Sequence, residues 1–172
     1  MSAETVHLFL NPAAGRGRTA KREPRIRQIL ERCGKPVAVH HSTGVGDLES
    51  QVRRFAEDDE RLLVVAGGDG TIHEATNGIM TSGRPASLGV IPGGTGNDFA
   101  KASDIPLDWE LATEQLATRL AEATTGRRVD VGRMNDRFFA NCAGIGFDAS
   151  VTDIARSYNC LLYTSPSPRD LN

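Results

Sequence analysis

Two short glycine-rich segments hold the residues best suited to chemistry. Residues 67–71 read Gly-Gly-Asp-Gly-Thr, and residues 92–98 read Pro-Gly-Gly-Thr-Gly-Asn-Asp. Glycine lets backbone N–H groups approach an anion because it has no β-carbon, and it tolerates the positive φ that a concave loop requires. A carboxylate in such a loop repels phosphate unless a cation lies between them. Asp69 and Asp98 therefore predict Mg²⁺, which prefers carboxylate and phosphate oxygens, and the two segments predict a nucleotide-dependent phosphotransferase.

These segments follow apolar runs that are typical of buried strands, and a third segment, Asn-Pro-Ala-Ala-Gly at 11–15, follows another such run. Strands and helical patterns alternate along the chain, which predicts an α/β fold with a parallel, doubly wound sheet. Ligands of such sheets bind outside the carboxyl ends of the strands, so we expect all three segments at one edge. The expected strands are 6–10, 36–42, 61–66 and 87–92, and the helical patterns lie at 24–33, 48–55, 72–79 and 109–120.

Local signals predict where three helices begin or end. Pro24 fits the first turn of a helix, where its missing N–H costs little, and Gly34 fits the position after its last turn. Thr71 and Glu74 have the spacing of a capping box, in which both side chains satisfy free N–H groups of the following helix. Pro106 is expected to precede the apolar stripe of the longer helix that begins near Trp109.

The composition changes after Gly126, where we place a domain boundary. Arg127–Arg133 and Arg137–Ile145 read as two strands joined by a tight turn at 134–136. We therefore expect a nucleotide-binding α/β domain at 1–126 and the start of a β-rich second domain at 127–159. Residues 160–172 resemble translated sequencing-adapter sequence, with a native Ser/Pro-rich tail as the alternative, and both interpretations keep them out of the fold.

Composition excludes several classes of protein. A formal charge of -2 and a pI near 6.1 lack the basic signature of nucleic-acid binding, so no nucleic-acid partner is expected. The three cysteines are widely spaced, which disfavours a zinc site or disulfide scaffold and fits a reducing cytoplasm. No apolar run approaches ~18 residues and no signal peptide is evident. Membrane contact is thus expected only peripherally, at the inner face of the membrane.

Other polar clusters have simpler interpretations. His40 and His41 end a predicted strand, and we expect solvated side chains there in preference to metal ligands. A basic cluster near a helix start is more often a solvated face than a phosphate site, so we interpret it as a solvated face. Its members are Arg16, Arg18, Lys21 and Arg22.

Four motifs occur in an order that resembles the diacylglycerol kinase catalytic-domain family of lipid kinases. They are Asn-Pro-x-x-Gly at 11–15, Gly-Gly-Asp-Gly-Thr at 67–71, Pro-Gly-Gly-Thr-Gly-Asn-Asp at 92–98 and Gly-x-Gly-Phe-Asp-Ala at 144–149. The resemblance covers roughly residues 5–155, and it implies that the β-rich second domain at 127–159 is lipid-binding. It implies transfer of the γ-phosphate of ATP to a lipid hydroxyl, with diacylglycerol giving phosphatidic acid, and it leaves a homodimer open.

The resemblance also implies roles for individual residues. Asp69 and Asp98 would be catalytic and would act through ATP-bound Mg²⁺, while the general base and a structural magnesium site of the family would lie beyond residue 172. His73 is expected beside the nucleotide without acting as a base, and Thr43 is expected to contact the nucleotide. The whole predicted set for ATP is Asn11, Pro12, Ala13, Ala14, Gly15, Thr43, Gly67, Gly68, Asp69, Gly70, Thr71, Ile72, His73, Gly94, Thr95, Gly96 and Asn97.

Two alternatives to a lipid kinase stay open from the residues. NAD kinases also carry Gly-Gly-Asp-Gly-Thr, so an NAD kinase-like phosphotransferase is one alternative, although the 11–15 and 92–98 segments favour the lipid kinases. A non-catalytic nucleotide-binding module is the other. The 172 residues as given are expected to bind nucleotide without lipid kinase turnover, because transfer needs nucleotide, lipid and base together.

Overall fold

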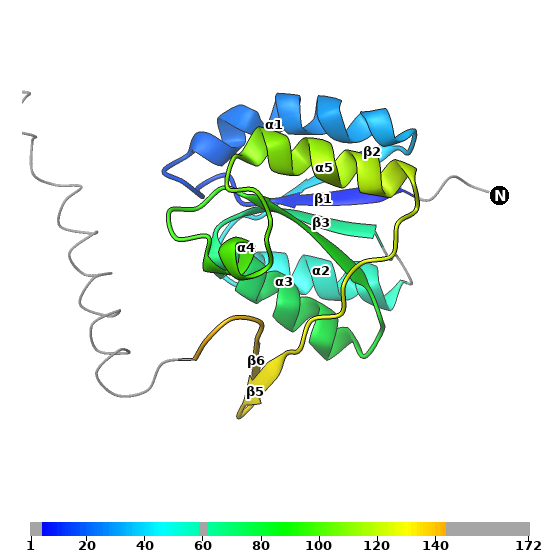
Figure 1. The fold of residues 1–172 in the computed structure, drawn as a ribbon. Helices are drawn as coiled ribbons and strands as arrows, with labels where there is room; N and C mark the ends of the chain where they lie inside the picture. Colours follow the sequence, from blue (N-terminus) through cyan, green and yellow to red (C-terminus); the bar gives the residue numbers. More distant parts are fainter. Residues whose placement is uncertain (1–4, 59–61, 144–172) are drawn as a thin grey trace, which may run out of the picture. The chain divides into compact units, whose positions relative to one another are not determined.

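The computed structural model of the chain describes residues 5–58 and 62–143. Met1–Asn141 and Cys142–Asn172 are two compact units, and all described helices and strands lie in the first (Figure 1). The predicted motif at 144–149 and the predicted tail at 160–172 lie outside the described residues. Within the described ranges, no helix combines the length and apolar character needed to cross a membrane.

A four-stranded parallel sheet forms the centre of the first unit. Its strand order is β2-β1-β3-β4, so the chain leaves β1 toward one side and later returns to the other side of β1. This arrangement confirms the predicted parallel, doubly wound sheet. The bounds are β1 (Val6–Leu10), β2 (Val37–His41), β3 (Leu62–Gly67) and β4 (Ser87–Pro92).

Helices cover both faces of this sheet. Figure 1 shows α1 and α5 on one face and α2 and α3 on the other. A short 3-10 helix, Glu31–Cys33, extends α1. The helices are α1 (Arg18–Leu30), α2 (Asp47–Glu57), α3 (Asp69–Ser82), α4 (Asp98–Ala102) and α5 (Trp109–Ala121).

The core has two halves because successive residues of a strand point to opposite faces. On β1, Leu8 and Leu10 pack with the cluster beneath α1 and α5, whereas Phe9 packs with the cluster beneath α2 and α3. All three side chains are fully buried, and each contributes about 1.5–3 kcal/mol by leaving water. Burial on both faces fixes the register of the central strand, and with it the point where the strand ends.

The predicted start of α1 was wrong, although its end is confirmed. The helix begins at Arg18, and Pro24 lies inside it. An interior proline loses one backbone hydrogen bond, but burial of Ile26 and Ile29 provides the packing that stabilises most protein helices. Gly34 follows the terminal 3-10 turn with a left-handed φ of 77°, as predicted.

The predicted capping box of α3 was also wrong. The helix starts at Asp69 and its N-cap is Gly68, which offers no side-chain acceptor. Thr71 is therefore already inside the helix, and Glu74 Oε2 accepts a hydrogen bond from the backbone N of Glu49 at 3.3 Å. The Glu74 carboxylate, which the spacing assigned to the end of its own helix, thus connects α3 to α2. The sequence analysis also missed α4, whose five residues show no periodicity.

The region after Gly126 contains a short hairpin. Its strands, β5 (Gly132–Met134) and β6 (Arg137–Phe139), pair antiparallel, and Asn135 at the turn has φ 54°. The tight turn is confirmed. Both predicted strands were too long. Residues 127–131 form no strand, because exposed backbone without a neighbouring strand gains no ladder hydrogen bonds. The second predicted strand ends at Phe139 within the described residues.

The prediction of solvated side chains at 40 and 41 holds only for His41, which is exposed and pairs with Glu23 at 2.6 Å. The ring of His40 instead lies 5.0 Å from Phe9 and 4.6 Å from Phe55, measured between ring centres. Burial lowers the pKa of His40 below its ordinary value of 6.5. The side chain turns inward because residue 40 shares the α2 side of the sheet with Phe9.

The basic cluster at the start of α1 is largely the solvated face that was predicted, since Arg16, Arg18 and Lys21 are exposed. Arg22 differs, because its guanidinium stacks 5.0 Å from the ring centre of Trp109. This contact ties α1 to α5.

Candidate active site

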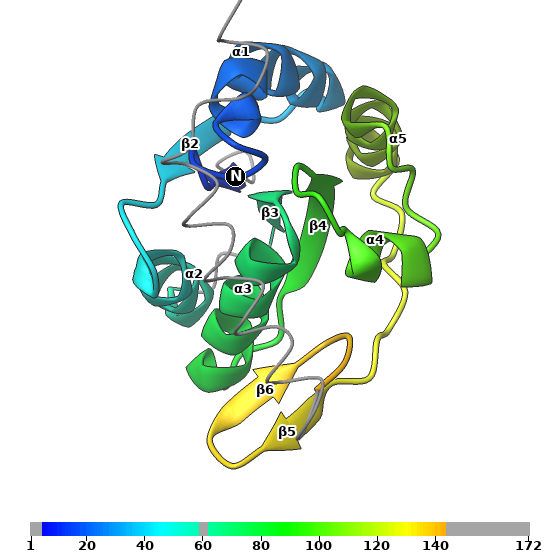
Figure 2. The ribbon, with the colours of Figure 1, turned by 90° about the vertical axis from the view of Figure 1, so that its left-hand side faces the viewer.

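The three glycine segments meet at one edge of the sheet, as predicted, and Figure 2 looks toward this edge. Asn11 N donates to Ala66 O at 3.3 Å, and Gly93 N donates to Gly67 O at 2.7 Å. These bonds join the ends of β1, β3 and β4. The edge between β1 and β3 is also where the strand order reverses, the usual ligand position in doubly wound sheets.

The segment after β1 is a compact turn. Asn11 Oδ1 accepts from Ala13 N at 3.0 Å, so the Asn11 side chain folds its own loop. Gly15 has φ 60°, and a β-carbon there would collide with the carbonyl oxygen of Gly93. Two features therefore require glycine at position 15: its positive φ and the close approach of the segment after β4.

The junction between β3 and α3 is shorter than the predicted loop. Gly67 ends the strand, Gly68 alone connects, and Asp69 begins the helix. A β-carbon on Gly67 would overlap the side chain of Thr71. Because the first N–H groups of a helix have no acceptor within it, those of residues 69–71 point out of the end of α3, where the helix dipole favours an anion.

Two carboxylates converge beside Gly96. A β-carbon on Gly96 would lie 2.8 Å from Asp69 Oδ2 and 3.5 Å from Asp98 Oδ2. The other oxygen of Asp69 accepts from Phe99 N at 3.2 Å, which orients the carboxylate. Asp98 is more exposed and accepts from Lys101 Nζ at 2.9 Å. The fold therefore brings together the two predicted acidic residues, Asp69 from the segment after β3 and Asp98 from the segment after β4.

The segment after β4 is closed by Asn97. Asn97 Oδ1 accepts from Gly94 N, and Asn97 Nδ2 donates to Gly94 O, both at 3.0 Å. Asn97 has φ 54°, a backbone conformation that asparagine tolerates better than most residues. Its side chain shapes this loop, while Thr95 at the tip is exposed.

Other predicted residues have partners outside the glycine segments. Thr43 donates from N at 2.7 Å and from Oγ1 at 2.8 Å to Asp47 Oδ2. The backbone hydrogen bond, followed by the hydroxyl one, lowers the pKa of Asp47. His73 Nε2 lies 3.3 Å from Arg137 Nη2 on the hairpin. Ile72 is buried in the core beneath α3, so only its backbone faces the helix start.

Thr19 is a site-supporting residue that the sequence analysis missed. It is 1% exposed, and its hydroxyl donates to Ala14 O at 3.1 Å and lies 3.5 Å from Gly93 O. It thereby joins the β1 segment to the β4 segment. A lone threonine in a basic helix start gives no sequence signal for this role, because the contact partner is distant in sequence.

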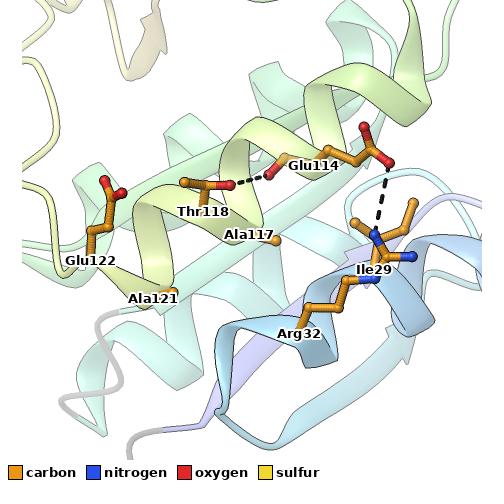
Figure 3. A pocket seen from close by; sticks show the side chains of 7 residues that line it. All are labelled: Ile29, Arg32, Glu114, Ala117, Thr118, Ala121 and Glu122. Carbon is orange, nitrogen blue, oxygen red and sulfur yellow. Dashed lines mark hydrogen bonds and ion pairs between the residues drawn. The ribbon is translucent and has the colours of Figure 1, made fainter.

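A pocket between α1 and α5 lies away from the glycine segments (Figure 3). Its volume is about 460 Å³, and the Arg32–Glu114 ion pair, with an N–O distance of 3.8 Å, forms part of its wall. It contains none of the predicted site residues. Its lining residues are Ile29, Arg32, Glu114, Ala117, Thr118, Ala121 and Glu122.

Asp69 and Asp98 supply hard oxygen donors that fit Mg²⁺ shared with phosphate oxygens. Among the residues that the structure describes, no three His, Cys, Asp or Glu side chains gather around a potential metal position. Mg²⁺ usually keeps water and substrate phosphates as ligands and needs only one or two carboxylates. The Gly96 region therefore fits a cation that is bound together with a nucleotide.

Comparison with known proteins places this arrangement in a family. The family model described as diacylglycerol kinase catalytic domain matches residues 5–134. The diacylglycerol kinase of Staphylococcus carnosus (strain TM300) is 30% identical over 161 residues, which are 94% of this chain and 50% of that protein. The diacylglycerol kinase of Bacillus subtilis (strain 168) is 36% identical over 140 residues, covering 81% and 45% of the two chains.

Solved structures show the same similarity. The crystal structure of a diacylglycerol kinase from Bacillus anthracis str. Sterne superposes with a TM-score of 0.70 at 30% identity, covering 81% of this chain and 49% of that one. This chain thus spans about half the length of the relatives that it matches. The matched half contains the parallel sheet and the glycine segments.

Proposed function

Since this chain belongs to the diacylglycerol kinase catalytic domain family, we propose that it forms the nucleotide-binding part of an ATP-dependent lipid kinase. The proposed reaction transfers the γ-phosphate of ATP to the hydroxyl of diacylglycerol and yields phosphatidic acid. One observation carries this proposal: the start of α3 and the carboxylates of Asp69 and Asp98 lie together at the edge where β1, β3 and β4 end.

The start of α3 is the proposed phosphate site. The N–H groups of residues 69–71 supply donors directed out of the helix, and Gly68 and Gly70 carry no side chain that would block a phosphate. The β1 and β4 segments border this point, because Gly15 and Gly68 both approach the β4 segment closely. The remaining predicted nucleotide residues, including Thr43 and His73, keep their proposed roles as neighbours of the nucleotide.

Asp69 and Asp98 are the proposed residues for holding Mg²⁺ through the nucleotide. The cation would neutralise charge on the phosphates during transfer. The Phe99 N–H keeps one oxygen of Asp69 oriented, which leaves its second oxygen directed toward the Gly96 region. Asp98 exchanges its contact with Lys101 for the nucleotide complex, because an exposed pair of this kind contributes little stability.

The protein's main contribution to transfer is positioning and charge stabilisation. The base that removes the proton from the lipid hydroxyl is proposed to lie beyond the described residues. Because diacylglycerol resides in membranes, we also propose peripheral contact with the cytoplasmic face of the membrane. A homodimer stays a prediction.

Titration calorimetry of this chain with ADP tests the nucleotide site. We expect binding in the presence of Mg²⁺ and about tenfold weaker binding when EDTA removes the cation. Asp98→Asn should lose this difference, whereas Asp136→Asn, at a hairpin carboxylate that is 98% exposed, should retain it. A folded sample that binds no Mg²⁺–ADP rejects the proposed nucleotide site.

Transfer itself is tested in the parent protein, meaning the full open reading frame in which residues 5–143 occur. The assay presents diacylglycerol in mixed micelles or NAD in solution, each with labelled ATP. Labelled phosphatidic acid without labelled NADP is the expected outcome. Phosphorylation of NAD alone would replace the proposed function with the NAD kinase alternative.

A further inference from the structure

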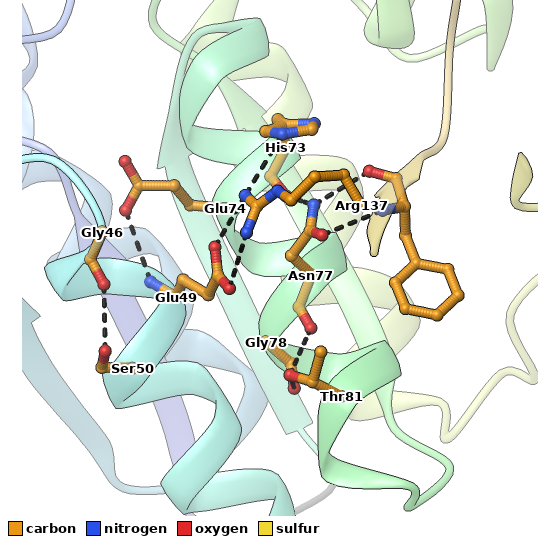
Figure 4. Close-up of polar contacts among 10 residues, drawn as sticks. Gly46, Glu49, Ser50, His73, Glu74, Asn77, Gly78, Thr81 and Arg137 are labelled. Carbon is orange, nitrogen blue, oxygen red and sulfur yellow. Dashed lines mark hydrogen bonds and ion pairs between the residues drawn. The ribbon is translucent and has the colours of Figure 1, made fainter. Parts of the chain in front are cut away.

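The β5–β6 hairpin is attached to the side of α3 by a buried amide (Figure 4). Asn77 Oδ1 accepts from Phe138 N at 3.0 Å, and Asn77 Nδ2 donates to Phe138 O at 2.9 Å. This pair of bonds matches what a neighbouring antiparallel strand offers to one residue. Asn77 therefore takes the place of a strand beside β6.

The Asn77 side chain has no spare hydrogen-bonding capacity. It is 0% exposed, and Nδ2 also donates to His73 O at 2.9 Å. The amide nitrogen of Asn77 donates to two backbone carbonyl oxygens, and the amide oxygen accepts from a backbone N–H group. Exchanging the nitrogen and the oxygen would break all three hydrogen bonds, so the amide has one satisfied orientation. Since a buried polar group without a hydrogen-bond partner is costly, this geometry selects one position for Phe138.

An ion pair attaches the same hairpin to α2. Arg137 Nη1 and Nη2 donate to the two carboxylate oxygens of Glu49 at 3.0 and 2.8 Å. This two-pronged geometry restricts orientation as well as distance, and the hydrogen bonds that Arg137 donates to Glu49 raise the pKa of Arg137. Arg137 Nη2 also faces His73 Nε2. A guanidinium only donates, so that nitrogen of His73 is the acceptor in this contact.

We propose that Asn77 and the Glu49–Arg137 pair form a hairpin latch that positions the β5–β6 hairpin relative to Asp69. This inference rests on the proposed function and adds positioning residues to it. Asn77 stands about two turns after Asp69 on the same helix. Asp69 at the proposed phosphate site and Asn77 at the hairpin therefore belong to one rigid element, helix α3.

Positioning of this kind matters because phosphoryl transfer depends on holding two reactants in line. A misplacement of about 1 Å costs on the order of a hundredfold in rate. Within the described structure, the latch residues form hydrogen bonds to α2, α3 and β6 and not to the glycine segments. The latch is therefore proposed to act on the reaction mainly through the hairpin, with His73 as its contact to the predicted nucleotide residues.

Amide hydrogen exchange in this chain tests the latch directly, by NMR at the Phe138 N–H. Asn77→Asp keeps the shape and the acceptor but sets a carboxylate against two carbonyl oxygens, so exchange should accelerate about tenfold or more. Arg137→Ala, at an exposed position, should have a smaller effect of the same sign without unfolding the chain. Arg53→Ala is the matched control, because this exposed arginine pairs only loosely with Glu57, at 4.0 Å.

The structural part of the proposal is rejected if Phe138 exchanges freely in the unaltered chain, or if both latch variants exchange at the unaltered rate. An Asn77→Asp variant that fails to fold leaves the decision to Arg137→Ala. Paired reversal of charge, Glu49→Arg with Arg137→Glu, should restore slow exchange that each single reversal removes.

Kinetics of the parent protein test the positioning role. Arg137→Ala should lower kcat for diacylglycerol about tenfold and change KM for ATP far less, and the paired reversal should recover activity. Unchanged kcat with a released hairpin overturns the positioning role. If the unaltered parent transfers no phosphate to diacylglycerol, the proposed function and the positioning role both fall, whereas the exchange data still decide whether the latch exists.

Discussion

The two regions attached to α3 are held by opposite means. At its start, the segments after β1, β3 and β4 approach through glycine: a β-carbon on Gly94 would lie 2.5 Å from the Cα of Gly68. Along its side, the hairpin is held by the side chains of Asn77 and Arg137. The closest approaches in the first region are therefore between main-chain atoms, whereas side chains bridge the elements in the second.

This difference determines how each region fails. The first region is broken by adding atoms, because almost any side chain occupies the space that the neighbouring backbone needs. The second is broken by removing or recharging a side chain, because its contacts are hydrogen bonds and an ion pair. The first kind of contact leaves a trace in the sequence, namely glycine, and the second does not.

The largest expected effect concerns activity and lies in the first region. Asp69→Asn keeps an oxygen that accepts the Phe99 N–H but removes the charge proposed to act through Mg²⁺. Transfer by the parent protein should fall by about a hundredfold or more, with the thermal midpoint and Phe138 exchange of this chain unchanged. Asp136→Asn should retain full activity, and wild-type activity of Asp69→Asn would exclude the proposed metal role.

The next effect tests the backbone packing itself. Gly94→Ala brings a methyl group against the Cα of Gly68, which cannot rotate away, so the free energy of unfolding in urea should fall by about 1–3 kcal/mol. Gly126→Ala is the matched control because no atom lies within 4 Å of its added β-carbon; it should change stability by less than about 0.5 kcal/mol. Equal stability of the two variants would contradict the close approach.

Acid should weaken the sheet that supports both regions. The pKa of His40 in the fold lies below its ordinary value of 6.5, through burial and the nearby charges of His7, Arg54 and His41. The unfolded chain therefore protonates His40 more readily than the folded chain does. Neutral, buried His40 contributes its full share to the free energy of unfolding above pH 6.5, and this share is lost as the pH falls below 6.5. Urea titrations should show a slope of at most about 1.4 kcal/mol per pH unit, reduced in His40→Gln. An unchanged slope in that variant would assign the effect to another group.

The smallest expected effect concerns Gly70, a glycine of the first region at which an added β-carbon would meet no neighbouring element among the described residues. No atom lies within 4 Å of a β-carbon added there, so Gly70→Ala should stabilise α3 by up to about 1 kcal/mol. The same methyl group lies beside the proposed phosphate site and should weaken Mg²⁺–ADP binding in calorimetry. Loss of stability would show that this glycine also serves packing.

Periodic and chemical signals predicted much of the fold. The apolar runs of β1, β3 and β4 and the stripe of α5 identified these elements, and the glycine segments after the strands predicted the edge where they meet. The convergence of Asp69 and Asp98 followed from the same logic, because both come after neighbouring parallel strands.

Features that depend on distant partners escaped prediction. The start of α1 ahead of Pro24 reflects packing that outweighs a lost hydrogen bond, and the inward ring of His40 depends on Phe55 of a different helix. The capping-box spacing of Thr71 and Glu74 was wrong because Glu74 contacts α2. The same holds for Asn77, whose partners on β6 lie 61 residues further along the chain.

By itself, the sequence determined the alternation of strands and helices, the glycine positions and the supply of carboxylates at strand ends. These are local properties, set by periodicity, by backbone freedom and by residue type. Only the tertiary structure decided that Thr19 joins two loops, that Asn97 closes its own, and that Asn77 stands in for a strand. A polar side chain can satisfy its hydrogen bonds in many ways, and burial against one partner selects among them.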